Sequence, residues 1–342
     1  MNYVQSRDNY SNEISTVLTT ISNVYDTDTF ATSIEQMCFN NVISSIVSTK
    51  RKDVLDWKLL ADVFGCSPEI AKRTIEVTTR RCIRASNGPR LSRRYHTYDG
   101  MLRYSRLACD MFTDTLFAKV KSVRGCNMAQ MFVSDFNYLY IGLLRTRSEF
   151  PQALKHFFKR NGVPHSLIAD GAKEQVKGES RRLCNLSSCS LIELEKDTPW
   201  ANIAELQIGL CKRGRMRELK RTNAPMRFWC YLWDWYSRKN NVMAKDHYQL
   251  FGQTLHFKAK GIVPDILDIC EFPWYSWVYF RDYAATFPFN KERLGKYLGP
   301  AEHAGTMLSK WVLNDKGTKL PFQTLRLLPP SERDSETERD KR

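Results

Sequence analysis

The sequence predicts an α/β fold with a mixed β-sheet and flanking helices for its central part. Between residues 107 and 245, short runs rich in β-branched and aromatic residues alternate with longer segments of helical periodicity. Alternation of this kind places helices on the faces of a sheet. A helical region precedes this part. Short strands with Gly and Pro turns follow it, and they predict a small C-terminal β-barrel.

Two amphipathic helices are expected shortly before the sheet. The first has an apolar stripe that begins at Trp57, and the second begins at Ser67-Pro68, an N-cap followed by proline at the first helical position. The pair resembles a helix-turn-helix with basic side chains for phosphates, and an ordinary helical hairpin fits the pattern equally well. The helices and a basic, turn-rich linker form region 53–106, which follows a poorly defined N-terminal region, 1–52.

The central domain, residues 107–245, is predicted to contain three strands, a helix, a strand, a helix, a strand and two helices. These elements are expected at 109–118, 129–134, 138–144, 148–160, 166–169, 173–184, 190–195, 202–221 and 226–245. Three consecutive strands followed by alternating helices and strands is the order of a ribonuclease-H-like core. Fold order alone does not establish chemistry.

Three acidic residues stand out by their positions in these elements. Asp114 lies within the first strand, Asp170 ends the fourth, and Glu205 opens the helix after the fifth. Both aspartates lie in or directly after apolar runs, where an unpaired carboxylate is costly. Carboxylates that converge from three segments can hold two divalent metal ions, so we expect Mg²⁺ or Mn²⁺ and phosphoryl-transfer chemistry at Asp114, Asp170 and Glu205.

Positive charge predicts a polyanionic partner. The formal net charge is +15, and residues 72–124 hold thirteen basic against four acidic side chains. The helix that begins near Glu205 continues into a basic stripe, which we interpret as a phosphate-binding surface; a solvated cationic helix face is the alternative. The basic residues expected to contact DNA are Lys173, Lys212, Arg213 and Arg215.

The C-terminal part is divided into a linker at 246–271, a β-barrel module for DNA binding and assembly at 272–330, and a tail at 331–342. Strands are expected at 274–281, 294–298, 308–313 and 320–327. A barrel of this size could equally bind protein. The tail has no apolar residue and is predicted to be disordered.

Three sequence segments resemble the integrases of copia-type LTR retrotransposons, members of the D,D,E integrase and transposase superfamily. They are Phe112-Thr113-Asp114-Thr115, the stretch from Asn161-Gly162-Val163-Pro164 to Asp170-Gly171-Ala172-Lys173-Glu174, and Pro199-Trp200-Ala201-Asn202-Ile203-Ala204-Glu205. Asp170 and Glu205 are separated by 34 residues, close to the family's characteristic 35, and the resemblance covers roughly residues 55 to 330.

The resemblance implies a retrotransposon integrase, a piece of a polyprotein, that trims DNA 3′ ends and joins them to target DNA. It assigns the metal-ligand role to Asp114, Asp170 and Glu205 and implies that Lys212 contacts element-end DNA. It also places Asn202 in the loop before the glutamate, as a further DNA-binding residue. The implied partner is double-stranded DNA, both element ends and target. A homo-oligomer and a nuclear location, after a stage in a cytoplasmic particle, are expected.

Several features limit or depart from this assignment. Only His96 precedes the core and the cysteines are dispersed, so no zinc is predicted, although the family usually carries a zinc module. No run of 18 apolar residues and no hydrophobic leader is present, so no membrane contact is expected. Two alternatives stay open: an inactive or domesticated DNA-binding protein with this fold, and a ribonuclease-H-like nuclease that uses an extra carboxylate, Asp135 or Glu174.

Overall fold

A computed structural model of the chain describes residues 55–80, 104–195, 203–248, 250–282, 291–301 and 308–333, with Pro288, Ala304 and Ser335. The chain divides into two units, Met1–Arg51 and Lys52–Arg342, and every described residue belongs to the second. The predictions for region 1–52 and for most of the basic linker and of the tail therefore lie outside the described residues.

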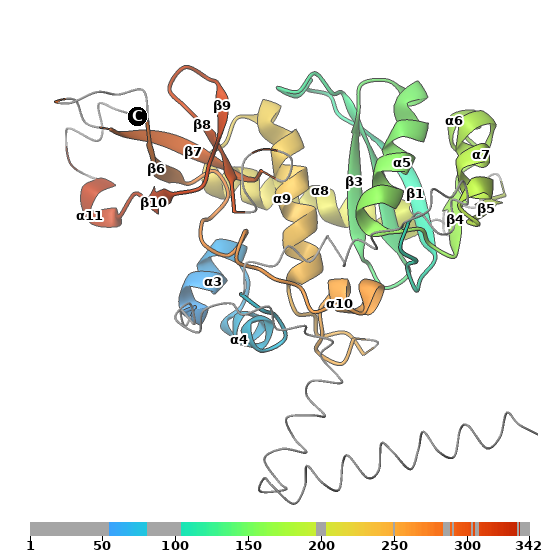
Figure 1. Cartoon of the computed structure of the whole chain (residues 1–342), viewed down its shortest axis with the longest axis horizontal. Helices are drawn as coiled ribbons and strands as arrows, with labels where there is room; N and C mark the ends of the chain where they lie inside the picture. Colours follow the sequence, from blue (N-terminus) through green and yellow to red (C-terminus); the bar gives the residue numbers. More distant parts are fainter. Residues whose placement is uncertain are drawn as a thin grey trace, which may run out of the picture. The chain divides into compact units, whose positions relative to one another are not determined.

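A five-stranded mixed sheet forms the centre of the second unit. Its strands are β1 (Met111–Phe117), β2 (Met128–Ser134), β3 (Leu139–Leu144), β4 (Ser166–Ala169) and β5 (Ser190–Glu193). They lie in the order β3-β2-β1-β4-β5 (Figure 1). The first three pair antiparallel, whereas β4 is parallel to β1 and β5 is parallel to β4. The predicted mixed sheet with flanking helices is confirmed.

The two faces of the sheet bury different cores, because successive side chains of a strand point to opposite faces. On one face, Phe132 stacks on Phe157 of helix α5 (Phe150–Asn161), with their ring centroids 4.6 Å apart. On the other face, Met131 and Val133 belong to a core that includes helices α8 (Ile203–Thr222) and α9 (Trp229–Val242). Short 3-10 turns, Arg147–Glu149 and Met226–Phe228, precede α5 and α9.

Two helical predictions needed revision. The single helix expected at 173–184 is two helices, α6 (Lys173–Val176) and α7 (Gly178–Leu186), because the chain breaks at Lys177 and Gly178, where the glycine has φ 59°. The linker expected at 246–271 contains a helix, α10 (Leu255–Lys260), capped by the Thr254 side chain, which accepts a hydrogen bond from the Phe257 N–H at 3.1 Å. This helix is too short to leave a clear periodic pattern.

The helical pair before the sheet is present as α3 (Trp57–Phe64) and α4 (Pro68–Glu76). The Asp56 side chain caps α3 and Ser67 caps α4, and Gly65 ends α3 in the left-handed region at φ 58°. The hairpin is joined to the core at α9, whose Lys239 Nζ donates to the Phe64 carbonyl at 2.9 Å.

A second, antiparallel sheet forms the C-terminal part. It contains β6 (Trp277–Arg281), β7 (Glu292–Pro300), β8 (Lys310–Leu313), β9 (Lys319–Phe322) and β10 (Leu325–Leu327), and a short helix, α11 (Pro330–Arg333), follows. The strand order is β10-β6-β7-β8-β9. Only two residues separate β9 from β10 along the chain, yet the two strands lie at opposite edges of the sheet. The sheet must therefore curl to bring its edges together, as the predicted barrel requires. Phe280 of β6 stacks on Phe322 of β9 at 4.5 Å.

Helix α9 contacts strands of both sheets, β3 on one side and β7 on the other (Figure 1). Gly299 of β7 lies against Trp235, because a Cβ added to the glycine would lie 3.8 Å from the tryptophan Cβ. Within the described residues, no helix is both long and apolar enough to cross a membrane.

Candidate active site

The register of the central sheet brings two of the predicted site residues to neighbouring positions. In the parallel ladder between β1 and β4, Thr113 pairs with Ala169. Asp114 and Asp170 are the next residues on their strands, and neighbouring strands lie about 4.8 Å apart. The two aspartates therefore start from adjacent backbone positions, although 55 positions separate them along the chain.

The alternation of β1 then determines which helix Asp114 faces. Leu116, two residues along the same strand, belongs to the core that contains Ile208 of α8, so Asp114 lies on the α8 face of the sheet. Helix α8 packs on both β1 and β2. Glu205 lies in the first turn of α8. The predicted triad thus comes from β1, from the end of the neighbouring β4, and from the helix that covers β1.

The electrostatics of Asp114 place it within reach of the charges of Asp170 and Glu205. Burial raises the pKa of Asp114 above the usual value, and the negative charges of Asp170 and Glu205 raise this pKa further. The Thr115 N–H, which donates to Asp114 Oδ1 at 2.6 Å, and the positive charge of Lys212 lower it. A cation bound among these carboxylates would relieve their mutual repulsion.

The donor chemistry fits a hard divalent cation. Asp114 is half-buried, while Asp170 and Glu205 are exposed, so their oxygens can reach an ion that also keeps water and phosphate ligands. Within the described residues, however, no group of three His, Cys, Asp or Glu side chains is arranged to hold a metal ion. Asp170 Oδ1 instead accepts the Gly171 N–H at 2.9 Å. The metal-ligand role of the triad therefore stays a prediction.

A buried polar network supports β1 on the face opposite Asp114. Gln130 of β2 donates to Thr113 Oγ1 at 2.7 Å and accepts from Thr115 Oγ1 at 2.8 Å. Gln175 of α6 donates to the same Thr115 oxygen at 3.0 Å. These bonds fix the backbone on both sides of Asp114. Our sequence reasoning missed this network, although a glutamine inside the apolar run of β2 was a visible signal.

The alternative carboxylates lie in different places. Asp135 follows Ser134, which pairs with Met111 at the start of β1, and its charge acts on Cys109, whereas Glu174 lies 4.0 Å from the guanidinium of Arg147. Glu193, which sequence reasoning did not select, ends β5 opposite Ala169 in the ladder. A Cβ added to Gly171 would lie 2.9 Å from Glu193 Oε1, so this carboxylate reaches the residue after Asp170.

The predicted DNA-contact residues do not all share one surface. Lys173, Lys212 and Arg213 are exposed. Arg215 departs from the prediction: its guanidinium stacks on the ring of the fully buried Trp233, 3.3 Å from the centroid, and it is therefore not available to a phosphate in this arrangement. Asn202 lies in the segment 196–202, outside the described residues.

No protein-family model matches the sequence, and no curated protein matches it either. Solved structures with a similar chain path include the simian T-cell lymphotropic virus intasome in complex with PP2A regulatory subunit B56 gamma, at 12% identity and a TM-score of 0.36. This match covers 80% of this chain and 95% of the other.

Two structures of the HTLV-2 integrase catalytic core domain in complex with magnesium are also similar. The trimeric form has 14% identity and a TM-score of 0.35, covering 44% of this chain and 95% of the other. The dimeric form has 15% identity and a TM-score of 0.34, covering 43% and 94%. At such identities, function has to be argued from the residues of the site.

Proposed function

We propose that this chain is a metal-dependent polynucleotidyl transferase of the integrase type, which trims DNA 3′ ends and joins them to target DNA. One observation carries the proposal: Thr113 pairs with Ala169, so that Asp114 and Asp170 follow at adjacent positions, and β1 is covered by α8, which carries Glu205 in its first turn. Two-metal phosphoryl transfer requires carboxylates held on rigid elements close to one another, and the pairing of β1 with β4 under α8 supports such a site.

In this proposal, each residue of the site has a distinct role in the reaction. Asp114, Asp170 and Glu205 would hold the divalent ions, which, when bound, activate the attacking oxygen and stabilise the leaving oxygen. The Thr115 N–H keeps the Asp114 carboxylate oriented. Lys212, whose charge reaches Asp114 and which is exposed, would bind a DNA phosphate next to the reacting bond.

The finer assignment belongs to the same proposal. The sequence motifs favour a copia-type retrotransposon integrase that is one piece of a polyprotein, acts as a homo-oligomer on element ends and target DNA, and reaches the nucleus after a cytoplasmic particle stage. The division into a helical region, a catalytic core at 107–245 and a C-terminal module at 272–330 is likewise proposed, with the last contributing DNA contacts and assembly.

A strand-transfer assay tests the proposal. Short labelled duplexes that end in the terminal sequence of the encoding element are incubated with the full chain and Mg²⁺ or Mn²⁺. We expect joined products that disappear with Asp114→Asn, Asp170→Asn and Glu205→Gln, and with a chelator. Asp135→Asn is the matched control, because that carboxylate lies beyond the start of β1 and not beside Asp170, and it should retain joining. Salt-sensitive DNA binding with no joining, unaffected by the three substitutions, would instead identify a non-catalytic DNA-binding protein.

A ribonuclease-H-like nuclease is the second candidate, and the position of Glu193 favours it. A fourth carboxylate beside Asp170 would suit an enzyme that hydrolyses without joining. Cleaved but never joined strands, lost in Glu193→Gln, would identify this activity. Full joining by Glu193→Gln would exclude a required role for the fourth acid.

A further inference from the structure

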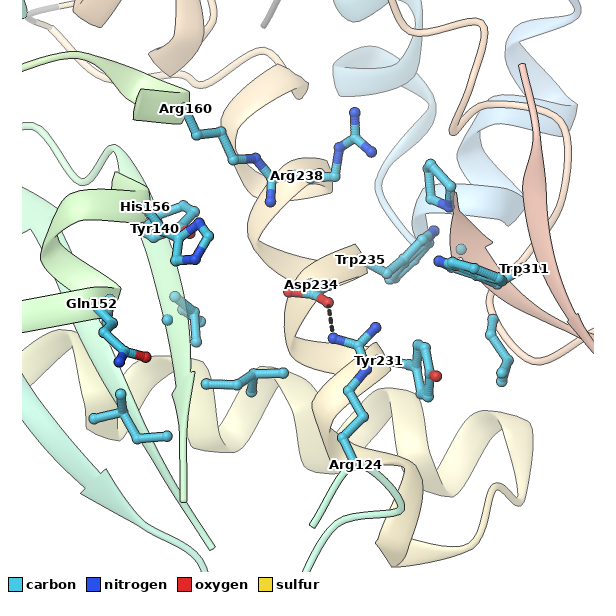
Figure 2. A pocket seen from close by; sticks show the side chains of 18 of the residues that line it. Arg124, Tyr140, Gln152, His156, Arg160, Tyr231, Asp234, Trp235, Arg238 and Trp311 are labelled. Atoms are coloured by element: carbon cyan, nitrogen blue, oxygen red, sulfur yellow. Dashed lines mark hydrogen bonds and ion pairs between the residues drawn. The ribbon is translucent and has the colours of Figure 1, made fainter. Parts of the chain in front are cut away.

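A cavity far from the triad lies along the outer edge of the central sheet. Its volume is about 540 Å³, and its walls come from β3, α5, α9 and the C-terminal strands β7 to β9. Figure 2 shows Tyr140, Gln152 and His156 on one side, Trp235 and Trp311 together on the other, and the Arg124–Asp234 ion pair between them. The size is that of a pocket for a small ligand or a short chain segment.

The cavity follows the backbone of β3 and is not confined to one of its faces. All five consecutive residues 140–144 line it. Side chains of a strand alternate between faces, so consecutive lining residues indicate that the strand edge itself borders the cavity. β3 is an edge strand of its sheet. On the opposite wall, residues 298–300 of β7 extend past the last β6 pair, which is Trp277 with Lys296.

The hydrogen-bond pattern shows which backbone groups point into the cavity. The Ser134 N–H donates to the Tyr138 carbonyl at 2.9 Å, so every second residue after Tyr138 bonds to β2. The groups of Leu139, Ile141 and Leu143 therefore point outward. The Asn241 side chain bonds to both outward backbone groups of Leu139: it accepts from the N–H at 2.9 Å and donates to the carbonyl at 2.6 Å. Within the described part of the chain, the outward groups of Ile141 and Leu143 have no such partner.

An unpaired edge of this kind accepts another strand, and the rest of the cavity indicates its chemistry. Four cationic side chains line the cavity, Arg124, Arg160, Arg238 and Lys319, against two carboxylates, Glu149 and Asp234. Asp234 is already paired with Arg124 at 2.9 Å, and Arg238 is paired with Asp268 at 2.7 Å, which leaves Arg160 and Lys319 against Glu149. The surplus of positive charge favours acidic side chains in an occupant.

Two tryptophans, Trp235 and Trp311, form the aromatic wall of the cavity. Trp311 lies under the Lys319 ammonium, 4.7 Å from its centroid, and offers a flat surface for apolar side chains.

We propose that this cavity binds an extended acidic peptide of a partner protein, which adds as a strand to the outer edge of β3. The peptide backbone would pair with Ile141 and Leu143, and its acidic side chains would meet the cationic wall. The capped Leu139 sets where the added strand must stop. This site is separate from the triad and does not depend on the proposed activity.

The test uses a short fluorescein-labelled peptide of alternating valine and glutamate, with the full chain, and reads fluorescence anisotropy. One control peptide carries N-methyl groups on alternate amides, which removes the pairing edge, and another has lysine in place of glutamate. We expect binding of the first peptide only. Amide hydrogen exchange over residues 139–144 should slow when it binds.

Three variants of the protein separate backbone pairing from charge. Leu143→Pro removes an outward N–H while leaving the ladder to β2, and Lys319→Glu reverses a wall charge. Each should weaken binding about tenfold, equivalent to about 1.4 kcal/mol. Lys316→Glu changes an exposed turn outside the cavity and should have no effect.

If Leu143→Pro fails to fold, the N-methylated peptide and Lys319→Glu still decide the question. Equal binding of the N-methylated peptide would overturn the proposal, as would binding unaffected by Lys319→Glu. Preferential binding of a labelled oligothymidylate over the acidic peptide would overturn it in favour of a single-stranded nucleic-acid site.

Discussion

Replacing Lys239 by methionine removes a buried ammonium group that joins three segments of the chain. Its Nζ lies 2.7 Å from Glu218 Oε1 of α8 and donates to the Phe64 carbonyl at the end of α3. The two charged side chains are only 7% and 8% exposed. Methionine has a similar length and is apolar, so the substitution tests the charge and its hydrogen bonds more than the packing.

The size of the effect follows from what remains after the substitution. Removing one partner of a buried ion pair typically destabilises a protein by about 3–5 kcal/mol. Here Arg221 still contacts Glu218 Oε2 at 2.9 Å, so the carboxylate keeps one cation. Burial also lowers the pKa of Lys239, which means that its ammonium is held at a desolvation penalty that methionine does not carry. We therefore expect a loss of about 2 kcal/mol, or about 3 °C in melting temperature for a chain of this size.

Thermal and urea unfolding measure the loss, with Lys220→Met as the matched control because Lys220 is exposed on α8, the helix that carries Glu218. Hydrogen exchange should accelerate in α3, whose last turn loses the bond to Phe64. The double variant Glu218→Leu/Lys239→Met should be more stable than the sum of the single effects predicts. A Lys239→Met stability within about 0.5 kcal/mol of the Lys220→Met control would refute the reasoning.

The other predictions concern the basic face of α8 and one buried amine. Lys212→Ala with Arg213→Ala should weaken DNA binding and reduce its salt slope by about 1.8, as expected for two lost phosphate contacts, whereas Arg215→Ala should mainly reduce stability. Equal salt slopes for the two variants would contradict this. Burial lowers the pKa of Lys245 to about 8. Between about pH 8 and pH 10, the unfolded chain therefore binds more protons at this residue than the folded chain does. The free energy of unfolding should rise by about 2 kcal/mol over this pH range. Urea titrations measure the rise, and Lys245→Met should abolish it.

Local patterns in the sequence predicted most elements of the fold because the forces that form them are local. The apolar runs of β1 to β3 and the N-cap at Ser67 correspond to observed elements. The break between α6 and α7 was missed because Gly178 is surrounded by residues that are compatible with a helix. The segment expected as one strand at 320–327 divides into β9 and β10, since the curl of the sheet moves the chain from one edge to the other.

The site was harder to predict, because its geometry depends on pairings between distant segments. The sequence indicated Asp114, Asp170 and Glu205 as candidates, but the pairing of Thr113 with Ala169 is a tertiary fact that periodicity does not contain. The orientation of the Arg215 side chain toward Trp233 likewise depends on tertiary packing. Helix α8 is covered by the sheet on one side and by α9 on another, so its basic stripe contains a residue that stacks on Trp233.

Helix α9 imposes a constraint on how the length of this chain can change. Four of its side chains hold different parts of the molecule: Asp234 pairs with Arg124, Trp235 lies against Gly299 of β7, Lys239 bonds to the end of α3, and Asn241 caps the edge of β3. Because one residue turns an α-helix by about 100°, a single insertion near its start would rotate all four away from their partners together. Insertions and deletions should therefore accumulate in the loops on either side of α9 and be absent within it.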